Sequence, residues 1–291
     1  MKRILFISMI ALAIWGCQKD TSTPAEPTIS AADSSAVSVS AENEAEADNI
    51  FDGVFDNVLG VNEECGIGTG IGVFAKKFSN GKEDSSKCFT VTISPNVKDS
   101  FPKTVTIDFG GGCKGPDGHV RKGKIVTTYT GPLSVPGKKS YTQFVDFFVD
   151  SIQVKGTLTV ENTSTSNQRS FTTTLVGGKL VYSTTKYNEY AFEKTVLQLE
   201  GNGTPNYPLD DIYKITGKSR STLVNNGTNN KWTAEISEPL IKKFTCKWFG
   251  KGIVTVTYNG VVVTKLNYGN GDCDNKATLT INGQTINITL K

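Results

Sequence analysis

The sequence is poor in residues and motifs that carry much of enzyme chemistry. It has a single histidine, His119, and two methionines among 291 residues. It contains no HExxH motif, no pair of CxxC motifs, no P-loop, and no GxGxxG placed between a strand and a helix. These absences exclude the common signatures of zinc proteases, zinc ribbons and nucleotide-binding folds. We therefore expect no cofactor, no metal ion and no catalytic residue that a motif identifies.

Long apolar runs are also scarce, and the one that exists lies at the N-terminus. Residues 1 to 3 read MKR, and an apolar run from Ile4 to Trp15 follows, then Gly16-Cys17. A run of about a dozen residues is too short for a hydrocarbon core of roughly 30 Å, which needs about 20 residues. This order of charge, apolar core and small residue is typical of a signal peptide over residues 1 to 16.

The residues after the run point to a lipid anchor. The stretch IWGC, residues 14 to 17, resembles the lipobox of bacterial lipoproteins, and Gln18-Lys19-Asp20 resembles the export signal of Bacteroidetes-type surface lipoproteins. Two further phrases share this likeness: FPKTVTIDFGGGCKGPDGHVRKGKI (101–125) and LNYGNGDCDNKATLTINGQ (266–284). The resemblance implies that Cys17 is acylated, becomes the mature N-terminus and holds the protein in the outer membrane, exposed at the cell surface.

Residues 17 to 48 are expected to form a disordered acidic tether. Residues 18 to 48 contain seven acidic side chains against one lysine, and they are rich in Ser, Thr, Ala and Pro with little to bury. The whole chain has a formal net charge of +3, so the positive excess lies in the body that follows. That body has no dense Lys/Arg block interleaved with aromatics, and nucleic acid is therefore not an expected partner.

The body is predicted to be all-β with one short leading helix. Apolar residues at helical spacing predict a helix over 49–60 that ends at Gly60. From Cys88 onward, short runs rich in Val, Ile, Thr, Tyr and Phe alternate with Gly, Asn and Pro, which is typical of antiparallel strands. We expect a sandwich or a long curved meander, divided into an N-terminal β region (49–175, with the helix) and a C-terminal β region (176–291).

Three dipeptides predict tight turns between these strands: Gly177-Gly178, Asn259-Gly260 and Asn282-Gly283. The two β regions also look related. The segment 154–175 resembles 215–236, since each has an apolar-x-Gly start, a Ser/Thr-rich strand, an Asn-rich turn and a second strand.

One element occurs twice, and it predicts two disulfides. TIDFGGGC (106–113) and KLNYGNGDC (265–273) each end a strand and reach a cysteine, and each has an earlier cysteine. A two-residue turn at Asn259-Gly260 places Cys246 opposite Cys273. The midpoint between Cys88 and Cys113 falls in the turn-like NVKDSFP. Directly opposed residues lie close to disulfide reach, so we predict Cys88–Cys113 and Cys246–Cys273. Cys65 is left over, either free or as a replacement for Cys113.

The ligand is not identified by the sequence, and three functions remain open. The leading interpretation is a non-enzymatic, lipid-anchored binding or adhesion protein for a glycan or another surface protein. The alternatives are a glycan-active enzyme with a carboxylate pair and a carrier that holds a lipid inside a curved sheet. The candidate carboxylates have no spacing that selects two of them; they are Asp146, Asp150, Glu161, Glu193, Glu200 and Glu235. Asp117, Asp272 and Asp274 lie in Gly/Asn-rich loops, which we interpret as turns rather than calcium sites.

Overall fold

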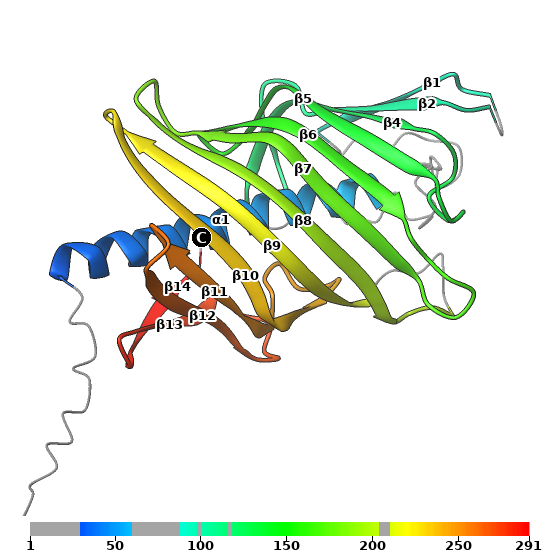
Figure 1. Cartoon of the computed structure of the whole chain (residues 1–291). Coiled ribbons are helices and arrows are strands. Elements are labelled where there is room, and N and C mark those ends of the chain that lie inside the picture. Colours follow the sequence, from blue (N-terminus) through cyan, green and yellow to red (C-terminus); the bar gives the residue numbers. More distant parts are fainter. Residues whose placement is uncertain (1–29, 60–87, 98–99, 116–117, 204–209, 291) are drawn as a thin grey trace, which may run out of the picture.

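The computed structural model describes residues 30–59, 88–97, 100–115, 118–203 and 210–290, and it contains one helix and one large antiparallel sheet within them (Figure 1). The helix is α1 (Ala31–Leu59). The strands are β1 (Thr90–Ser94), β2 (Lys103–Asp108), β3 (Cys113–Lys114), β4 (Val120–Tyr129), β5 (Lys139–Val149), β6 (Ile152–Asn162), β7 (Ser170–Val181), β8 (Lys186–Glu200), β9 (Ile212–Asn225), β10 (Thr228–Lys243), β11 (Lys251–Tyr258), β12 (Val262–Asn270), β13 (Lys276–Ile281) and β14 (Gln284–Thr289).

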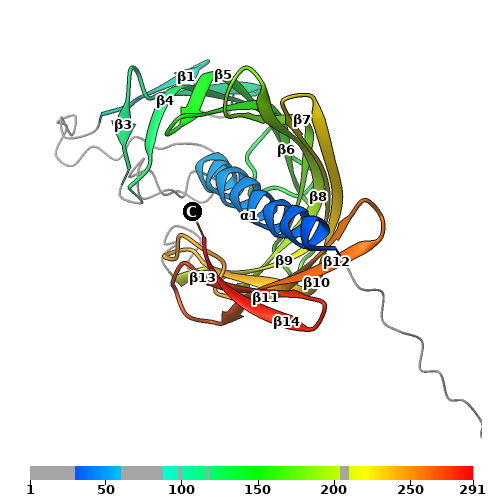
Figure 2. The same cartoon turned by 90° about the vertical axis from the view of Figure 1, so that its left-hand side faces the viewer.

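The 14-stranded sheet is a meander, because each strand pairs with its neighbour in the chain and only the short β3 lies off this path, paired with β4. The prediction of an all-β antiparallel fold is confirmed, in its meander form. Viewed along α1, the sheet curves around the helix as an open arc, with β1 to β4 at one end and β13 and β14 at the other (Figure 2). Among the described residues, no helix combines the length and apolarity needed to cross a bilayer.

The arc is built from bulges at which glycine allows two strands to approach closely. Register shifts interrupt the ladders of β6 with β7 next to Gly156 and of β11 with β12 next to Gly252. A Cβ on Gly156 would lie 2.8 Å from Gly178 Cα, and one on Gly252 would lie 2.5 Å from the Pro239 carbonyl oxygen. Both glycines also have positive φ. Bulges bend and twist a strand locally, so these positions give the sheet its concave face.

The concave face is filled by α1, and this corrects the predicted tether. Residues 31 to 48, expected to be disordered, form the first part of a 29-residue helix that continues to Leu59. The Ser30 hydroxyl caps its start by accepting a hydrogen bond from the Asp33 N–H at 3.1 Å. Toward its end, Phe51 stacks on Tyr190 with 5.9 Å between ring centroids. The helix is ordered by contacts with the sheet, which a composition-based argument does not take into account.

Two of the predicted turns also need correction. Gly177-Gly178 lies inside β7, where the register shifts between Leu175 and Gly178, and forms a bulge rather than a turn. The turn at Asn259-Gly260 contains three residues, because Tyr258 pairs with Val262. The third, Asn282-Gly283, is the expected two-residue hairpin turn, since Ile281 pairs with Gln284.

The proposed division of the body at residue 175 does not correspond to a break in the sheet. That position falls within β7, and the ladders continue on both sides of it. The two segments that resemble each other, 154–175 and 215–236, do form equivalent structures, because each lies in a hairpin, β6–β7 and β9–β10. The resemblance thus reflects repeated hairpins within one sheet.

Candidate functional site

The repeated element is a repeated structure, and we name its two occurrences the first module (residues 88–113) and the second module (residues 246–273). In each, an Asx-type hydrogen bond lies near the end of the strand, at the last residue of β2 and within the last four residues of β12. The Gly110 N–H donates to Asp108 Oδ1 at 2.9 Å, and the Gly269 N–H donates to Asn267 Oδ1 at 2.8 Å. Both glycines have positive φ, 57° and 95°. The side chain of Asp or Asn therefore redirects the chain at the same point in both modules.

Both predicted disulfides are present, one in each module. The Cα atoms are 5.2 Å apart in Cys88–Cys113 and 5.6 Å apart in Cys246–Cys273. The pairing was correct although the expected register was not, because the turn at 259–261 has three residues and a further shift lies between Lys251 and Ile253. Cys17 and Cys65 lie outside the described residues.

The first module stays joined to the strand that follows it. After β2, the Phe109 N–H donates to the Gly123 carbonyl at 2.9 Å, and the Gly123 N–H donates to the Gly110 carbonyl at 3.1 Å. The chain then forms β3, in which Cys113 pairs with Arg121 of β4. The phenyl ring of Phe109 is buried against Phe147, with ring centroids 5.8 Å apart.

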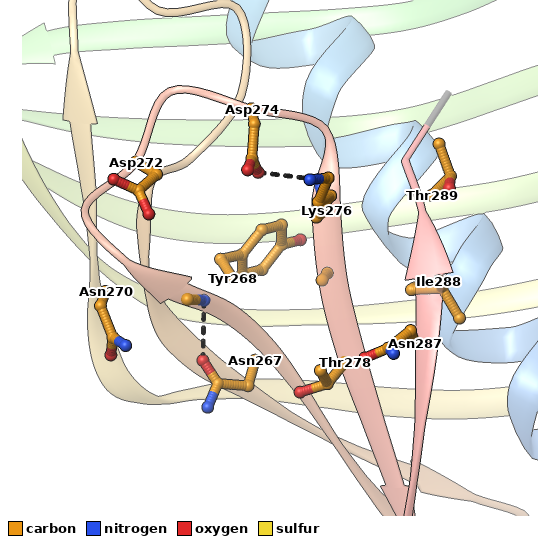
Figure 3. A pocket seen from close by; sticks show the side chains of 12 residues that line it. Asn267, Tyr268, Asn270, Asp272, Asp274, Lys276, Thr278, Asn287, Ile288 and Thr289 are labelled. Atoms are coloured by element: carbon orange, nitrogen blue, oxygen red, sulfur yellow. Dashed lines mark hydrogen bonds between the residues drawn. The ribbon is translucent and has the colours of Figure 1, made fainter.

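The second module separates from the strand that follows it. The β12–β13 ladder ends at the pair Asn267 and Thr278. β12 stays paired with β11 as far as Asn270, opposite Lys251, and the Gly271 N–H then donates to the carbonyl of Gly250, just before β11, at 2.7 Å. A pocket of about 690 Å³ lies between the loop that follows β12 and the β13–β14 ribbon (Figure 3). We call it the β12–β13 pocket.

Most of the residues that line the β12–β13 pocket have polar side chains, and they surround one aromatic side chain, although the lining surface includes a larger apolar part. Figure 3 shows Tyr268 in the middle, with the carboxylates of Asp272 and Asp274 on one side and the side chains of Thr278 and Asn287 on another. The Asp274 carboxylate accepts the Lys276 N–H at 2.9 Å, which fixes the end of the loop. The lining residues are Asn267, Tyr268, Gly269, Asn270, Asp272, Asp274, Lys276, Ala277, Thr278, Asn287, Ile288 and Thr289.

Tyr268 occupies the position that Phe109 has in the first module, and its hydroxyl group is the difference. The residue is 4% exposed, and its hydroxyl has no hydrogen-bond partner among the described residues. Burial raises the pKa of Tyr268, and the carboxylates of Asp48 and Glu44 on α1 raise it further, so the hydroxyl keeps its proton. A buried hydroxyl without a partner costs about 1–3 kcal/mol.

The side of α1 that faces the sheet carries four acidic residues at intervals of four: Glu44, Asp48, Asp52 and Asp56. Glu44 is buried and accepts hydrogen bonds from the Trp232 indole N–H at 2.8 Å and the Tyr190 hydroxyl at 3.1 Å. Desolvation, followed by the charge of Asp48, raises the pKa of Glu44 to about 7. A protonated Glu44 avoids placing two adjacent negative charges in the interior.

Two buried lysines of the sheet face the other acids of this stripe. Lys194 contacts Asp48, and Lys242 contacts Asp52 and lies 3.3 Å from Asp56. Burial lowers the pKa of Lys242 to about 7, while the two carboxylates beside it favour its charged form. These pairs tie the middle of α1 to β8 and β10, so the stripe has a structural role.

The structure distributes most of the candidate carboxylates over separate places. Asp150 pairs with His119, whose Nδ1 lies 2.7 Å from its carboxylate, and it accepts the Val120 N–H at 2.9 Å. Burial alone would raise the pKa of Asp150, but these two bonds lower it overall.

The other candidate carboxylates lie at separate places. Glu161 pairs with Lys139 at 2.9 Å. Asp146 lies at a bulge in β5, and Glu200 ends β8.

Two of the candidates do share a surface. Glu193 and Glu235 line a groove of about 470 Å³ that crosses β7 to β11. Lys218 of β9 is paired in register with both, with Glu193 on one side and Glu235 on the other. The two glutamates thus lie two strands apart, roughly 10 Å at the backbone, with Lys218 on the strand between them. This arrangement is a row of alternating charges on an open groove.

Neither the pocket nor the acidic stripe was identified from the sequence. The sequence did contain a sign of the acidic stripe, because acidic residues repeat at intervals of four. Like charges at this spacing destabilise an exposed helix, so their repetition indicates that cations of another element face them. Tyr268 had one too, since it replaces the phenylalanine of the first module. No short sequence pattern indicates the opening between β12 and β13, because the opening depends on which neighbouring strand the end of β12 pairs with.

Comparison of the chain with protein-family models, curated proteins and solved structures finds no match. The geometry described above is therefore the basis for any functional proposal.

Proposed function

We propose that this chain is a lipid-anchored protein of the bacterial outer membrane that binds a ligand at the cell surface without transforming it. The anchor rests on the IWGC stretch at residues 14 to 17 and the Gln18-Lys19-Asp20 that follows. A large sheet held by two disulfides suits an extracytoplasmic setting, where thiols are oxidised.

The observation that carries the binding role is the contrast between a filled concave face and an open polar pocket. Phe51 and Phe55 of α1 pack against the aromatic side chains of the sheet, with Phe55 and Phe171 centroids 6.0 Å apart. A lipid carrier would need this space for its cargo. The β12–β13 pocket, in contrast, is open and lined by carboxylates, amides and hydroxyls, which favours a polar ligand.

The surface groove favours binding over hydrolysis. A glycosidase needs two carboxylates about 5–9.5 Å apart with a raised pKa on the acid. Glu193 and Glu235 lie instead on either side of Lys218 in the strand ladders, so the two glutamates do not face each other across an uninterrupted gap.

The anchor is tested by radioactive palmitate labelling of cells that express the full chain. We expect label in the wild type and in Cys65→Ser, which is the matched control, and none in Cys17→Ser. Label that persists in Cys17→Ser contradicts the proposed anchor.

The binding role is tested with the full chain purified in detergent and mixed with insoluble polysaccharide and with protein extracted from the envelope of the producing cells. We expect co-sedimentation with one of these fractions and no release of reducing sugar ends. Release of reducing ends would make the protein a glycan-active enzyme, and failure to bind either fraction would contradict a binding role.

A further inference from the structure

We propose that the β12–β13 pocket is a binding site for a neutral carbohydrate, with one or two sugar units held by the exposed polar side chains of its lining. This inference rests on the proposed binding function and names its ligand class and its location. The pocket volume of about 690 Å³ falls within the range of ligand sites, about 300–1,000 Å³.

The chemistry of the lining matches the surface of a sugar. Each sugar hydroxyl both donates and accepts a hydrogen bond, so its site needs both kinds of partner. Asp272 and Asp274 supply carboxylate acceptors, Lys276 supplies a donor, and Asn287 supplies both in one amide. Carboxylates and amides that converge on a few hydroxyls give orientation and specificity, because charge-assisted hydrogen bonds are stronger than neutral ones.

The charge of the lining selects neutral over acidic sugars. Two aspartates and one lysine line the pocket, and no arginine is among the lining residues. Arginine is the side chain that binds carboxylate and phosphate with two parallel bonds. An anionic ligand would also meet the like charges of Asp272 and Asp274. The site therefore suits uncharged hexoses and N-acetylhexosamines.

The apolar part of the lining suits the C–H face of a sugar ring. Tyr268, Ala277 and Ile288 supply apolar atoms to the lining, and Ala277 pairs with Ile288 across the β13–β14 ladder. The hydroxyl of Tyr268 is itself buried, so it is not among the groups that a sugar in the pocket can reach. In the first module the corresponding ring is Phe109, and β3 pairs with β4 beside it.

The loop that forms one wall of the pocket is held in place. Cys273 of this loop is bonded to Cys246, and the Gly271 N–H donates to the Gly250 carbonyl. A site whose walls are fixed before binding loses less conformational entropy when the ligand arrives. The disulfide of the second module thus prepares the pocket for its ligand.

The test uses the full chain in detergent and methyl glycosides of glucose, galactose, mannose and N-acetylglucosamine, together with their linear tetrasaccharides. Saturation-transfer NMR identifies the sugar that binds, and calorimetry gives its affinity. Glucuronic acid and inorganic phosphate are the anionic comparison. We expect binding of at least one neutral sugar and no binding of the anions.

Variants then assign the site. Asp272→Asn and Asn287→Ala should each weaken the sugar about tenfold or more, which is the effect of losing one strong hydrogen bond. Gln284→Ala is the matched control, because Gln284 lies on β14 with Asn287 but does not line the pocket. It should bind like the wild type. All three positions are exposed, and thermal melting by circular dichroism checks that each variant folds.

The outcomes separate this inference from the proposed function. A neutral sugar that binds all variants equally overturns the pocket assignment and leaves the binding role intact. Binding of the anions but of no neutral sugar overturns the ligand class. If no sugar binds while the full chain still co-sediments with envelope protein, the carbohydrate assignment is wrong and the binding role stands. If neither sugars nor envelope fractions bind, both proposals fail.

Discussion

The first module and the second module share a turn, two glycines of positive φ and a disulfide. They differ in whether the chain stays paired with the strand that follows. After Phe109 the chain stays paired with the following strand, β4, whereas at Tyr268 it leaves the following strand, β13, and stays paired only with the preceding one, β11. The shared parts are local, set by an Asx turn and by glycine. The difference lies in long-range pairing. The same local motif therefore forms a continuously paired sheet corner in the first module and a pocket in the second module.

The largest expected contrast concerns the two aromatic rings. Phe109→Ala should lower the free energy of unfolding by about 3–5 kcal/mol, because the ring is buried between Phe89 and Phe147. Tyr268→Ala should cost less, since its ring packs on Phe249 beside an open pocket and its hydroxyl is unpartnered. Chemical denaturation of both variants measures this difference. An equal or larger loss for Tyr268→Ala would mean that the second module is packed as tightly as the first.

The two disulfides should stabilise the protein to a similar extent but differ in their effect on binding. They join residues 25 and 27 apart in sequence, so the loss of either should cost about 3 kcal/mol in the chain-entropy account. The double variant Cys246→Ala/Cys273→Ala should also weaken the ligand, because its loop forms a pocket wall.

The matched double variant Cys88→Ala/Cys113→Ala should lose stability and keep its affinity. Thermal melts and calorimetry on both variants separate the two effects. Equal losses of affinity would show that the disulfides act only through the general stability of the sheet.

The pH dependence of stability examines the surroundings of the second module, whose Tyr268 is close enough to Glu44 for the carboxylate to raise its pKa. The pKa of Glu44 is about 7 in the folded protein, against 4.5 ordinarily. Between these values the folded state binds more protons than the unfolded state. The free energy of unfolding should therefore fall as pH rises from about 4.5 to about 7, by roughly 3 kcal/mol from this group.

Lys242 changes the free energy of unfolding with pH in the opposite direction to Glu44. Its pKa is about 7 in the folded protein, against 10.5 ordinarily, so the unfolded state binds more protons between these values. Stability should then rise again above pH 7, and the two groups together place a minimum near neutrality. Glu44→Gln should remove the acid-side slope, whereas Glu42→Gln, an exposed acid on the same helix, should retain it. Denaturation curves at several pH values measure the free energy of unfolding of each variant. If its slope between pH 4.5 and 7 is unchanged in Glu44→Gln, the raised pKa of Glu44 is contradicted.

The smallest expected effect comes from exchanging the two aromatic residues. Tyr268→Phe should leave stability unchanged or raise it by about 1 kcal/mol, because it removes an unpartnered hydroxyl. Phe109→Tyr should lower it by about 1–3 kcal/mol, because it buries one. Melting temperatures of both variants provide the measurement. A destabilised Tyr268→Phe would show that the hydroxyl already has a partner such as bound water.

The sequence was sufficient for features that short-range patterns encode. Alternating β-branched residues gave the antiparallel fold, and the repeated cysteine spacing gave both disulfides. The register was missed by one residue along most of the β11–β12 ladder and by two at Lys251, because Asn259-Gly260 occurs in both two-residue and three-residue turns and a bulge follows. The helix from Ala31 was missed because its buried side includes Ser40, Glu44 and Asp48, polar residues whose burial requires partners on strands far along the chain. The pocket likewise depends on a long-range choice of strand partner.

The most direct test of the account follows backbone amide signals by NMR while a neutral sugar saturates the full chain in detergent micelles. We expect shifts at residues 267–276 and 287–289 and none at residues 108–114, since only the second module opens to a ligand. Shifts concentrated in the first module, or in the groove around Glu193 and Lys218, would contradict it.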